Sequence, residues 1–136
     1  MENEVLISQA LLAREMSYAP YSHFQVGAAL LTKNGKVYTG CNIENAAFSP
    51  TNCAERTAIF KAVSEGEKDF VKIVIVGGAE GKKLDYCPPC GLCRQVMREF
   101  VVPEEFIIIL AKSEQEYKEY TLAELFPENF GPDNLQ

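Results

Sequence analysis

Two short apolar runs in the second half of the chain restrict the folds that it can adopt. Residues 71–76 read VKIVIV and residues 106–110 read FIIIL, and both are rich in the β-branched side chains that favour strands. Neither run alternates regularly between apolar and polar residues, so both are expected to be strands buried on their two faces. A helical stretch over residues 91–101 separates them, which is typical of parallel strands covered by helices.

The other segments extend this α/β arrangement. The sequence predicts a helix over residues 5–18, strands over 24–32 and 36–43, a helix over 53–64, and a short helix opened by a Thr121–Glu124 capping box. Leu6, Ala10, Ala13 and Met16 form the apolar stripe of the first helix. Asn34-Gly35 indicates a tight hairpin, and Gly66 a helix end. The order of elements predicts one mixed sheet.

Length and charge narrow the class of protein further. The chain has 136 residues and no linker that would divide it, so residues 1–136 are interpreted as one domain. Its net charge of -6 argues against nucleic acid and anionic membranes as partners, because polyanion binding depends on neutralising phosphates. No apolar run is long enough to span a membrane, and the first residues are acidic, unlike a signal peptide. A cytoplasmic location is expected.

Five cysteines then need an explanation, because structural disulfides are rare in the cytosol and an odd number cannot pair completely. Cys53, Cys90 and Cys93 all fall at the expected starts of two helices, where the helix dipole stabilises a thiolate. Thiolates are the form of cysteine that binds zinc. Three protein ligands leave one tetrahedral position open, which is the arrangement of a catalytic rather than a structural zinc site.

Charged residues beside the first cysteine fit such a centre. Glu55, two residues after Cys53, is expected to face the metal without being a ligand and to exchange protons there. Three thiolates would reduce the Lewis acidity of zinc, and a guanidinium that donates to a ligand sulfur would offset this. Arg56 is the first candidate for that role and Arg94 the second.

Other interpretations of the cysteines remain open at this level. A lone C-x2-C pair is more often structural or redox-active than catalytic. Cys87 could close a four-thiolate structural site, or pair with Cys90 as a thiol oxidoreductase. An iron–sulfur run fails because its fourth position is Met97. Cys41 is expected to be a small core residue, and Cys87 a loop cysteine near the metal.

Longer blocks of sequence resemble the zinc-dependent cytidine deaminases. Beyond Cys53-Ala-Glu55 and Pro89-Cys90-Gly-Leu-Cys93, they include Ala19-Pro-Tyr-Ser22, Phe24-Gln-Val-Gly-Ala-Ala29, Gly40-Cys-Asn-Ile-Glu-Asn-Ala46, Asn52-Cys-Ala-Glu-Arg-Thr-Ala58, Cys90-Gly-Leu-Cys-Arg-Gln95 and Phe130-Gly-Pro132. A cysteine stands where the wider superfamily has a histidine, as in its small, all-cysteine branch. The resemblance implies a three-layer α/β/α sandwich around a mixed β-sheet of about five strands.

The resemblance also implies a role for each matching position. Zinc, one ion per chain, would be held by Cys53, Cys90 and Cys93, with Glu55 as proton shuttle and Arg56 donating to the sulfurs. Asn42 and Glu44 would hold the ribose, Phe24 would pack on the pyrimidine, and the Ala54 N–H would reach its carbonyl. Phe130 would serve a neighbouring subunit of a homotetramer with shared active sites. From the residues alone, Phe24 is more simply a core residue, and Asn42 and Glu44 a solvated pair.

The expected activity is hydrolytic deamination of free cytidine and deoxycytidine, a step of pyrimidine salvage. The substrate is then a small nucleoside. A nucleic-acid editing deaminase is disfavoured by the acidic charge. An aminonucleoside deaminase is disfavoured by the Asn42-Ile-Glu44 and Glu55-Arg56 pairs. Phe48 stands where the family often has tyrosine, which leaves substrate tolerance open.

Overall fold

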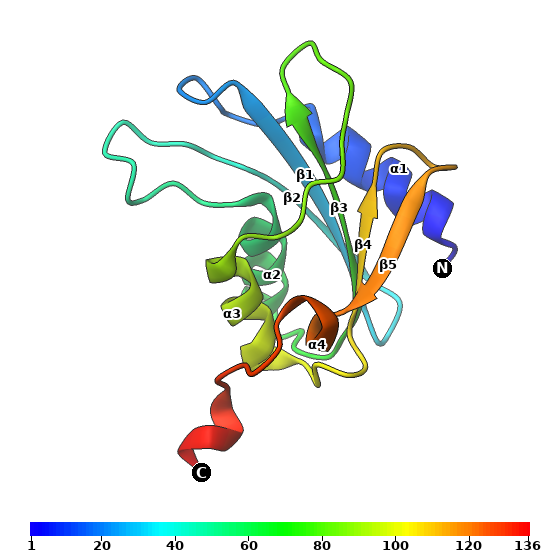
Figure 1. Cartoon of the computed structure of the whole chain (residues 1–136), viewed down its shortest axis with the longest axis vertical. Helices are drawn as coiled ribbons and strands as arrows, with labels where there is room; N and C mark the ends of the chain where they lie inside the picture. The colour runs from blue at the N-terminus through cyan, green and yellow to red at the C-terminus, as the bar shows by residue number, and fades with distance from the viewer.

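A computed structural model describes all 136 residues as one five-stranded sheet with helices on both faces (Figure 1). The elements are α1 (Asn3–Arg14), β1 (Phe24–Thr32), β2 (Val37–Cys41), α2 (Ala54–Ser64), β3 (Phe70–Ala79), α3 (Gly91–Phe100), β4 (Ile107–Ala111), β5 (Tyr117–Thr121), α4 (Leu122–Leu125) and a final 3-10 turn (Pro132–Leu135). None of the helices combines the length and apolarity needed to cross a bilayer.

The sheet is mixed, with strand order β2-β1-β3-β4-β5. The β3–β4 pair is parallel, and β1–β2, β1–β3 and β4–β5 are antiparallel. The parallel pair is the one formed by the two apolar runs, and α3 connects its strands. The expected α/β/α sandwich with a mixed sheet is therefore confirmed.

Alternation along the central strands assigns side chains to the two layers of helices. Even-numbered residues of β1 and β4 and odd-numbered residues of β3 face α2, α3 and α4, as Leu30, Ile73 and Ile108 do. Their neighbours Leu31 and Val74 pack on the other face, against α1. Both faces are apolar, which confirms that these strands are buried on two sides, although Val71 at the start of β3 is 38% exposed.

Three local predictions were wrong or incomplete. The first helix ends at Arg14 rather than residue 18, and Met16 is exposed, because Tyr18 pairs with the chain beyond β2 and starts a loop. The second strand ends at Cys41, since Ile43 leaves the sheet to pair with Tyr18 and Asn52. Strand β5 was not recognised from its pattern, because its sequence YKEYT is polar and it lies at the edge of the sheet.

The turn signals, by contrast, are confirmed. Gly35 and Gly66 both have positive φ, at the hairpin and after α2 respectively. Thr121 and Glu124 form the predicted capping box: the Glu124 N–H donates to the Thr121 hydroxyl at 3.2 Å, and the Thr121 N–H to the Glu124 carboxylate at 2.8 Å. These signals depend only on neighbouring residues, which is why the sequence reveals them.

Candidate active site

Three cysteine sulfurs meet where α2 and α3 begin. Cys53 is the N-cap residue of α2, Cys90 the N-cap of α3, and Cys93 lies in the first turn of α3. The three Sγ atoms all lie within 4.8 Å of one another, and those of Cys53 and Cys90 are 3.7 Å apart. Two helix N-termini therefore direct their free N–H groups and positive dipole ends towards one thiol cluster.

The spacing of this thiol cluster fits a zinc ion. Four ligands placed tetrahedrally at about 2.3 Å from zinc are about 3.8 Å from one another. The cluster supplies three such ligands, and Cys87 is not part of it. Cys87 Sγ instead fills the space above Gly77 of β3, and burial raises the pKa of its thiol to about 11. The donor set is thus that of a three-thiolate zinc site with one open position.

Hydrogen bonds within the thiol cluster favour the thiolate form of Cys53, which can bind a cation. Those from Cys93 and from Arg56 lower the pKa of the Cys53 thiol to about 5. The same bond between the two cysteines raises the pKa of Cys93, the partner that keeps the proton. At least one thiolate is therefore present at neutral pH, and it is the form that binds a metal.

Glu55 lies in the first turn of α2 beside the thiols. Its side chain is almost enclosed, with the residue 4% exposed. Burial raises the pKa of its carboxyl to about 7, and the negative charge of the Cys53 thiolate acts in the same direction. A carboxyl group with a pKa near neutrality can both take and return a proton at working pH.

The two candidate arginines behave differently. Arg56 donates to Cys53 Sγ at 3.3 Å, and its buried Nε has no hydrogen-bond partner. Arg94 does not contact a sulfur: it donates to the carbonyl oxygens of Pro89, at 2.8 Å, and Leu125. The prediction for Arg94 was wrong, because from its position in α3 it reaches the loop before that helix and the end of α4.

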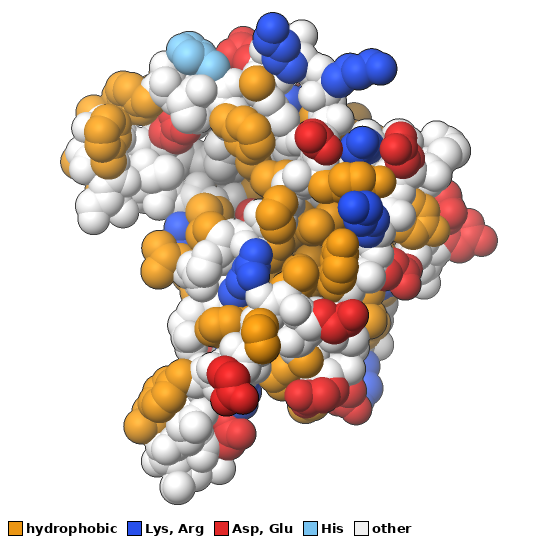
Figure 2. Space-filling model, in the orientation of Figure 1, with side chains coloured by type: hydrophobic (Ala, Val, Ile, Leu, Met, Phe, Trp, Pro, Cys, Tyr) orange, Lys and Arg blue, Asp and Glu red, His pale blue; other side chains and the backbone are white.

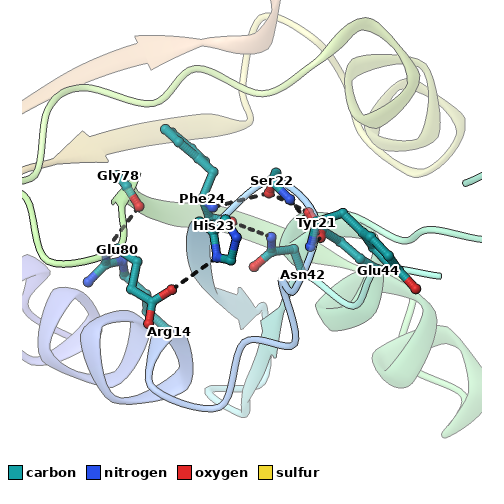
Figure 3. A network of polar contacts seen from close by, with 9 residues as sticks. All are labelled: Arg14, Tyr21, Ser22, His23, Phe24, Asn42, Glu44, Gly78 and Glu80. Atoms are coloured by element: carbon teal, nitrogen blue, oxygen red, sulfur yellow. Dashed lines mark hydrogen bonds and ion pairs between the residues drawn. The ribbon is translucent and has the colours of Figure 1, made fainter. Parts of the chain in front are cut away.

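Asn42 and Glu44 are not a freely solvated pair. The Asn42 side chain accepts from the Val26 N–H at 2.9 Å and donates to the Phe24 carbonyl at 2.7 Å. Glu44 accepts from the backbone N–H groups of Tyr21, at 2.9 Å, and Ser22, at 3.1 Å. Figure 3 shows both side chains turned towards the chain between α1 and β1. Both side chains therefore fix the backbone of this loop and of the start of β1.

The Ser22 hydroxyl also donates to Glu44, and this hydrogen bond lowers the pKa of the Glu44 carboxyl. Glu44 is therefore held as an anion, which can accept further hydrogen bonds. A shallow hollow of about 410 Å³ adjoins it, lined by Tyr21, Ser22, Glu44, Phe48 and Thr51. Figure 2 shows this side of the molecule hollowed between the loops and the end that carries α2 and α3.

Three further expected residues have distinct surroundings. Phe24, the first residue of β1, is 41% exposed, and its ring points away from the polar contacts around it (Figure 3), so it is not a core residue. Ala54 is fully buried at the first position of α2. Phe130 is 55% exposed on the C-terminal tail, where its carbonyl accepts from the Gln95 side chain at 2.9 Å.

Several residues that shape the site were not recognised in the sequence. Arg14 donates to the carbonyls of Gln25, at 2.8 Å, and Gly78, at 3.0 Å, and so ties α1 to the strand ends beside Phe24 (Figure 3). Ser17 donates to the Asn42 side chain. Only the Ala19-Pro-Tyr-Ser22 block pointed to this loop, because these partners are far apart in the sequence.

The remaining cysteines lie outside the thiol cluster. Cys87 is a half-buried loop residue whose pKa is also affected by the charges of Glu55, Cys53 and Cys90, so it lies near the cluster as expected. Cys41 ends β2 and is half-buried rather than enclosed in the core. Both are free thiols.

A three-thiol site open on one side, a buried glutamate beside it and an α/β/α fold together define a zinc-dependent deaminase. Residues 1–109 match the family model for the cytidine and deoxycytidylate deaminase zinc-binding region. The chain is 49% identical over 135 residues to a cytidine deaminase of Halalkalibacterium halodurans, covering 99% of this chain and 98% of that protein. A cytidine deaminase of Sporosarcina psychrophila is 47% identical, covering 99% and 96%.

Comparison with solved structures gives the same family. A crystal structure of cytidine deaminase from Burkholderia pseudomallei superposes with a TM-score of 0.86 at 43% identity, covering 96% of this chain and 100% of that one. That from Mycobacterium tuberculosis gives 0.80 at 33% identity, covering 96% and 98%. The chain belongs to the cytidine deaminase family of hydrolases.

Proposed function

We propose that this chain hydrolyses free cytidine and deoxycytidine to uridine and deoxyuridine, with release of ammonia, as an enzyme of pyrimidine salvage in the cytoplasm. One observation carries the proposal: the buried Glu55 carboxyl, with its pKa raised to about 7, beside three thiols that leave one metal position open. One zinc ion per chain, held by Cys53, Cys90 and Cys93, would supply Lewis acidity that activates water and stabilises the charge developing at the reacting carbon.

Glu55 carries the protons in this reaction. It accepts a proton from the attacking water and delivers it to ring N3 while the oxygen bonds to C4. It then takes the proton of the new hydroxyl group and gives it to the amino group, the C4–N bond breaks, and ammonia leaves. The carboxyl ends as it began, and its near-neutral pKa suits both directions of transfer.

Other residues would orient the nucleoside. Phe24 offers an exposed ring on which the pyrimidine packs, and the Ala54 N–H, at the first position of α2, donates to its carbonyl oxygen. Asn42 and the anionic Glu44 hold the ribose hydroxyls at the edge of the hollow. Because Glu44 is an anion, it also disfavours a substrate with a phosphate at that place.

We expect the active unit to be a homotetramer. Phe130 exposes 55% of its surface on a tail that leaves the body of the molecule (Figure 1), so its ring is accessible to a neighbouring copy. Contact with a neighbouring copy would bury it, and its ring would then complete the neighbour's active site. Arg56 supports the site within the chain through its hydrogen bond to Cys53.

The test combines metal content with turnover on defined substrates. The purified protein should contain one zinc per chain by elemental analysis and should decrease the ultraviolet absorbance of cytidine and deoxycytidine. Cytosine and a cytosine-containing single-stranded oligonucleotide should react far more slowly. Faster reaction of the oligonucleotide would favour a nucleic-acid editor, and a thiol-dependent redox activity without zinc would contradict the proposal.

The matched variant is Glu55→Gln, which preserves side-chain size but cannot shuttle protons. It should keep its zinc and lose about 10²–10⁴-fold in turnover, the usual contribution of a general acid–base group. Turnover near that of the unmodified protein would refute the role of Glu55.

A further inference from the structure

The segment between β3 and α3 is fastened to the sheet just before it reaches the thiol cluster. Asp85 forms an isolated antiparallel bridge with Gly77 of β3, and Leu84 packs against the core beneath α1. The Cys87 side chain fills the space above Gly77: a Cβ atom there would lie 2.8 Å from Cys87 Sγ. The polypeptide is thus held on both sides of Tyr86.

Tyr86 itself contacts two lysine side chains through its ring. The Nζ atoms of Lys112 and Lys118 are 4.6 Å and 4.3 Å from the centre of its ring, within the range of cation–π attraction. Lys112 follows β4 and is held in turn by Asp85 at 3.8 Å and Glu116 at 3.6 Å. These contacts join the segment before Cys90 to the β4–β5 hairpin.

The three cysteines of the thiol cluster depend unequally on this attachment. Cys93 is fully buried in the core on the α2 and α3 face, against which Tyr86 also packs. Cys53 is held by Arg56. Cys90 is exposed, and its sulfur lies against the other thiols of the cluster, 3.7 Å from Cys53 Sγ. Its position is therefore set by the backbone on both sides: by α3, whose Arg94 N–H donates to the Cys90 carbonyl at 3.0 Å, and by the segment that leads to it.

Two prolines make the backbone between Tyr86 and Cys90 stiff, so that a shift of Tyr86 also moves Cys90. Pro88 and Pro89 have fixed φ angles, and Pro89 is buried, so the segment between Tyr86 and Cys90 has little freedom to absorb a displacement. We propose that Tyr86, held by Lys112 and Lys118, is a positioning residue that fixes Cys90 for retention of the metal. The proposal rests on zinc binding by the thiol cluster.

The test measures zinc release from the zinc-loaded protein into excess chromogenic chelator. Tyr86→Ala should release zinc about 10-fold faster, at the lower end of the effect of residues that orient metal ligands. Tyr86→Phe keeps the ring and should release zinc as the unmodified protein does. Ile107→Ala, at the far end of β4, controls for general destabilisation and should leave the release rate unchanged despite a lower unfolding midpoint.

A second variant distinguishes the positioning role of Tyr86 from the charge of the lysines. It also serves as the test if Tyr86→Ala does not fold. Changing Lys112 and Lys118 together to Met removes two positive charges that repel a cation, and the relief of this Coulomb repulsion alone would slow zinc release. The positioning role predicts faster release instead. The thiolate-to-metal absorption of the cobalt-substituted protein should also change in Tyr86→Ala and return in Tyr86→Phe.

Release at the unmodified rate in both Tyr86→Ala and the double lysine variant would overturn the proposal. So would equal acceleration in Tyr86→Phe and Tyr86→Ala, or in Ile107→Ala. Absence of zinc from the unmodified protein would instead refute the function proposed above, so the two failures are distinguishable.

Discussion

Two glutamates of the site show how surroundings assign different chemistry to one side chain. Glu55 is buried beside thiols, and its pKa is raised to about 7, so it can hold a proton at neutral pH. Glu44 accepts hydrogen bonds from Ser22 and backbone N–H groups, and its pKa is lowered. One carboxyl is suited to proton transfer and the other to binding hydroxyl groups as an anion.

Removal of one sulfur should abolish metal binding. Cys53→Ala takes away the cysteine with the lowest pKa, leaves two thiols, and should lose both zinc and activity. Cys41→Ala is the matched control, because Cys41 lies outside the thiol cluster and should keep zinc. Elemental analysis of the two variants checks this; full zinc occupancy in Cys53→Ala would disprove its assignment as a ligand.

Among the elements, the site depends on how closely α2 approaches β2. A Cβ atom on Gly40 would lie 2.5 Å from the Ala54 carbonyl oxygen and 2.6 Å from the Ala58 nitrogen. These are backbone atoms of α2, which cannot move aside as the end of a flexible side chain can. Gly40 therefore allows the first turn of α2, with Glu55, to lie directly on the sheet.

Substitution of Gly40 by Ala should push α2 off β2. The overpacking should lower the free energy of unfolding by about 1–3 kcal/mol. Gly91→Ala is the control, since a Cβ there meets nothing within 4 Å. Urea unfolding of both variants measures the difference. Equal stability of Gly40→Ala and the unmodified protein would show that the helix adjusts freely.

The β1–β2 hairpin is held by charge at its turn. Glu67, after α2, accepts from Asn34 Nδ2 at 3.0 Å and pairs with Lys36 at 3.1 Å. The Asn34 hydrogen bond and the Lys36 charge lower the pKa of Glu67, and the same ion pair raises the pKa of Lys36. The contact joins the turn of the hairpin to the loop that follows α2.

The pH dependence of stability from the contact between Glu67, Asn34 and Lys36 follows from these pKa shifts. The contribution of Glu67 is complete above the ordinary carboxyl value of 4.5 and is lost as pH falls through its lowered folded pKa. That of Lys36 is complete below 10.5 and is lost as pH rises through its raised value. Glu67→Gln should thus be less stable than the unmodified protein at neutral pH, with the gap closing in acid. A gap independent of pH, by urea unfolding, would contradict this.

At the scale of the whole molecule, the C-terminal tail is hydrogen-bonded to α3 but projects outward. Arg98 of α3 donates to Asn129 and Asp133 and lies against Gly131, where a Cβ would be 2.3 Å from its Cζ. Gln95 holds the Phe130 carbonyl. These contacts attach the tail to α3 on both sides of Phe130, which would suit the shared active site proposed above.

Mixing of inactive subunits tests whether sites are shared. Phe130→Ala and Glu55→Gln should each be impaired alone. After dissociation and reassembly together, the Phe130→Ala subunits keep Glu55 and receive Phe130 from their partners, so activity should exceed the sum of the two. The control is a mixture of Phe130→Ala with the double variant Glu55→Gln/Phe130→Ala. It contains no Phe130 and should give no rescue. A simply additive mixture would show that Phe130 acts within its own chain.

The sequence alone indicated most of the fold and the chemical core of the site. The two apolar runs, the Asn34-Gly35 hairpin and the Thr121–Glu124 capping box depend on local pattern. Cys90 and Cys93 are close because only two residues separate them at the start of α3, and Cys53 was predicted to join them from its place at another helix start. Strand β5 was missed because YKEYT has no apolar face typical of a buried strand.

What the sequence determined by itself was the order of elements, the apolar strands, and the residue types from which a zinc site can be built. Tertiary structure decided that Asn42 and Glu44 are hydrogen-bonded to the loop after α1, that Arg56 rather than Arg94 meets a sulfur, and that two lysines lie against the ring of Tyr86. The physical reason is range: periodicity and turn chemistry act between neighbours, whereas these contacts join residues that only the packing of helices on the sheet brings together.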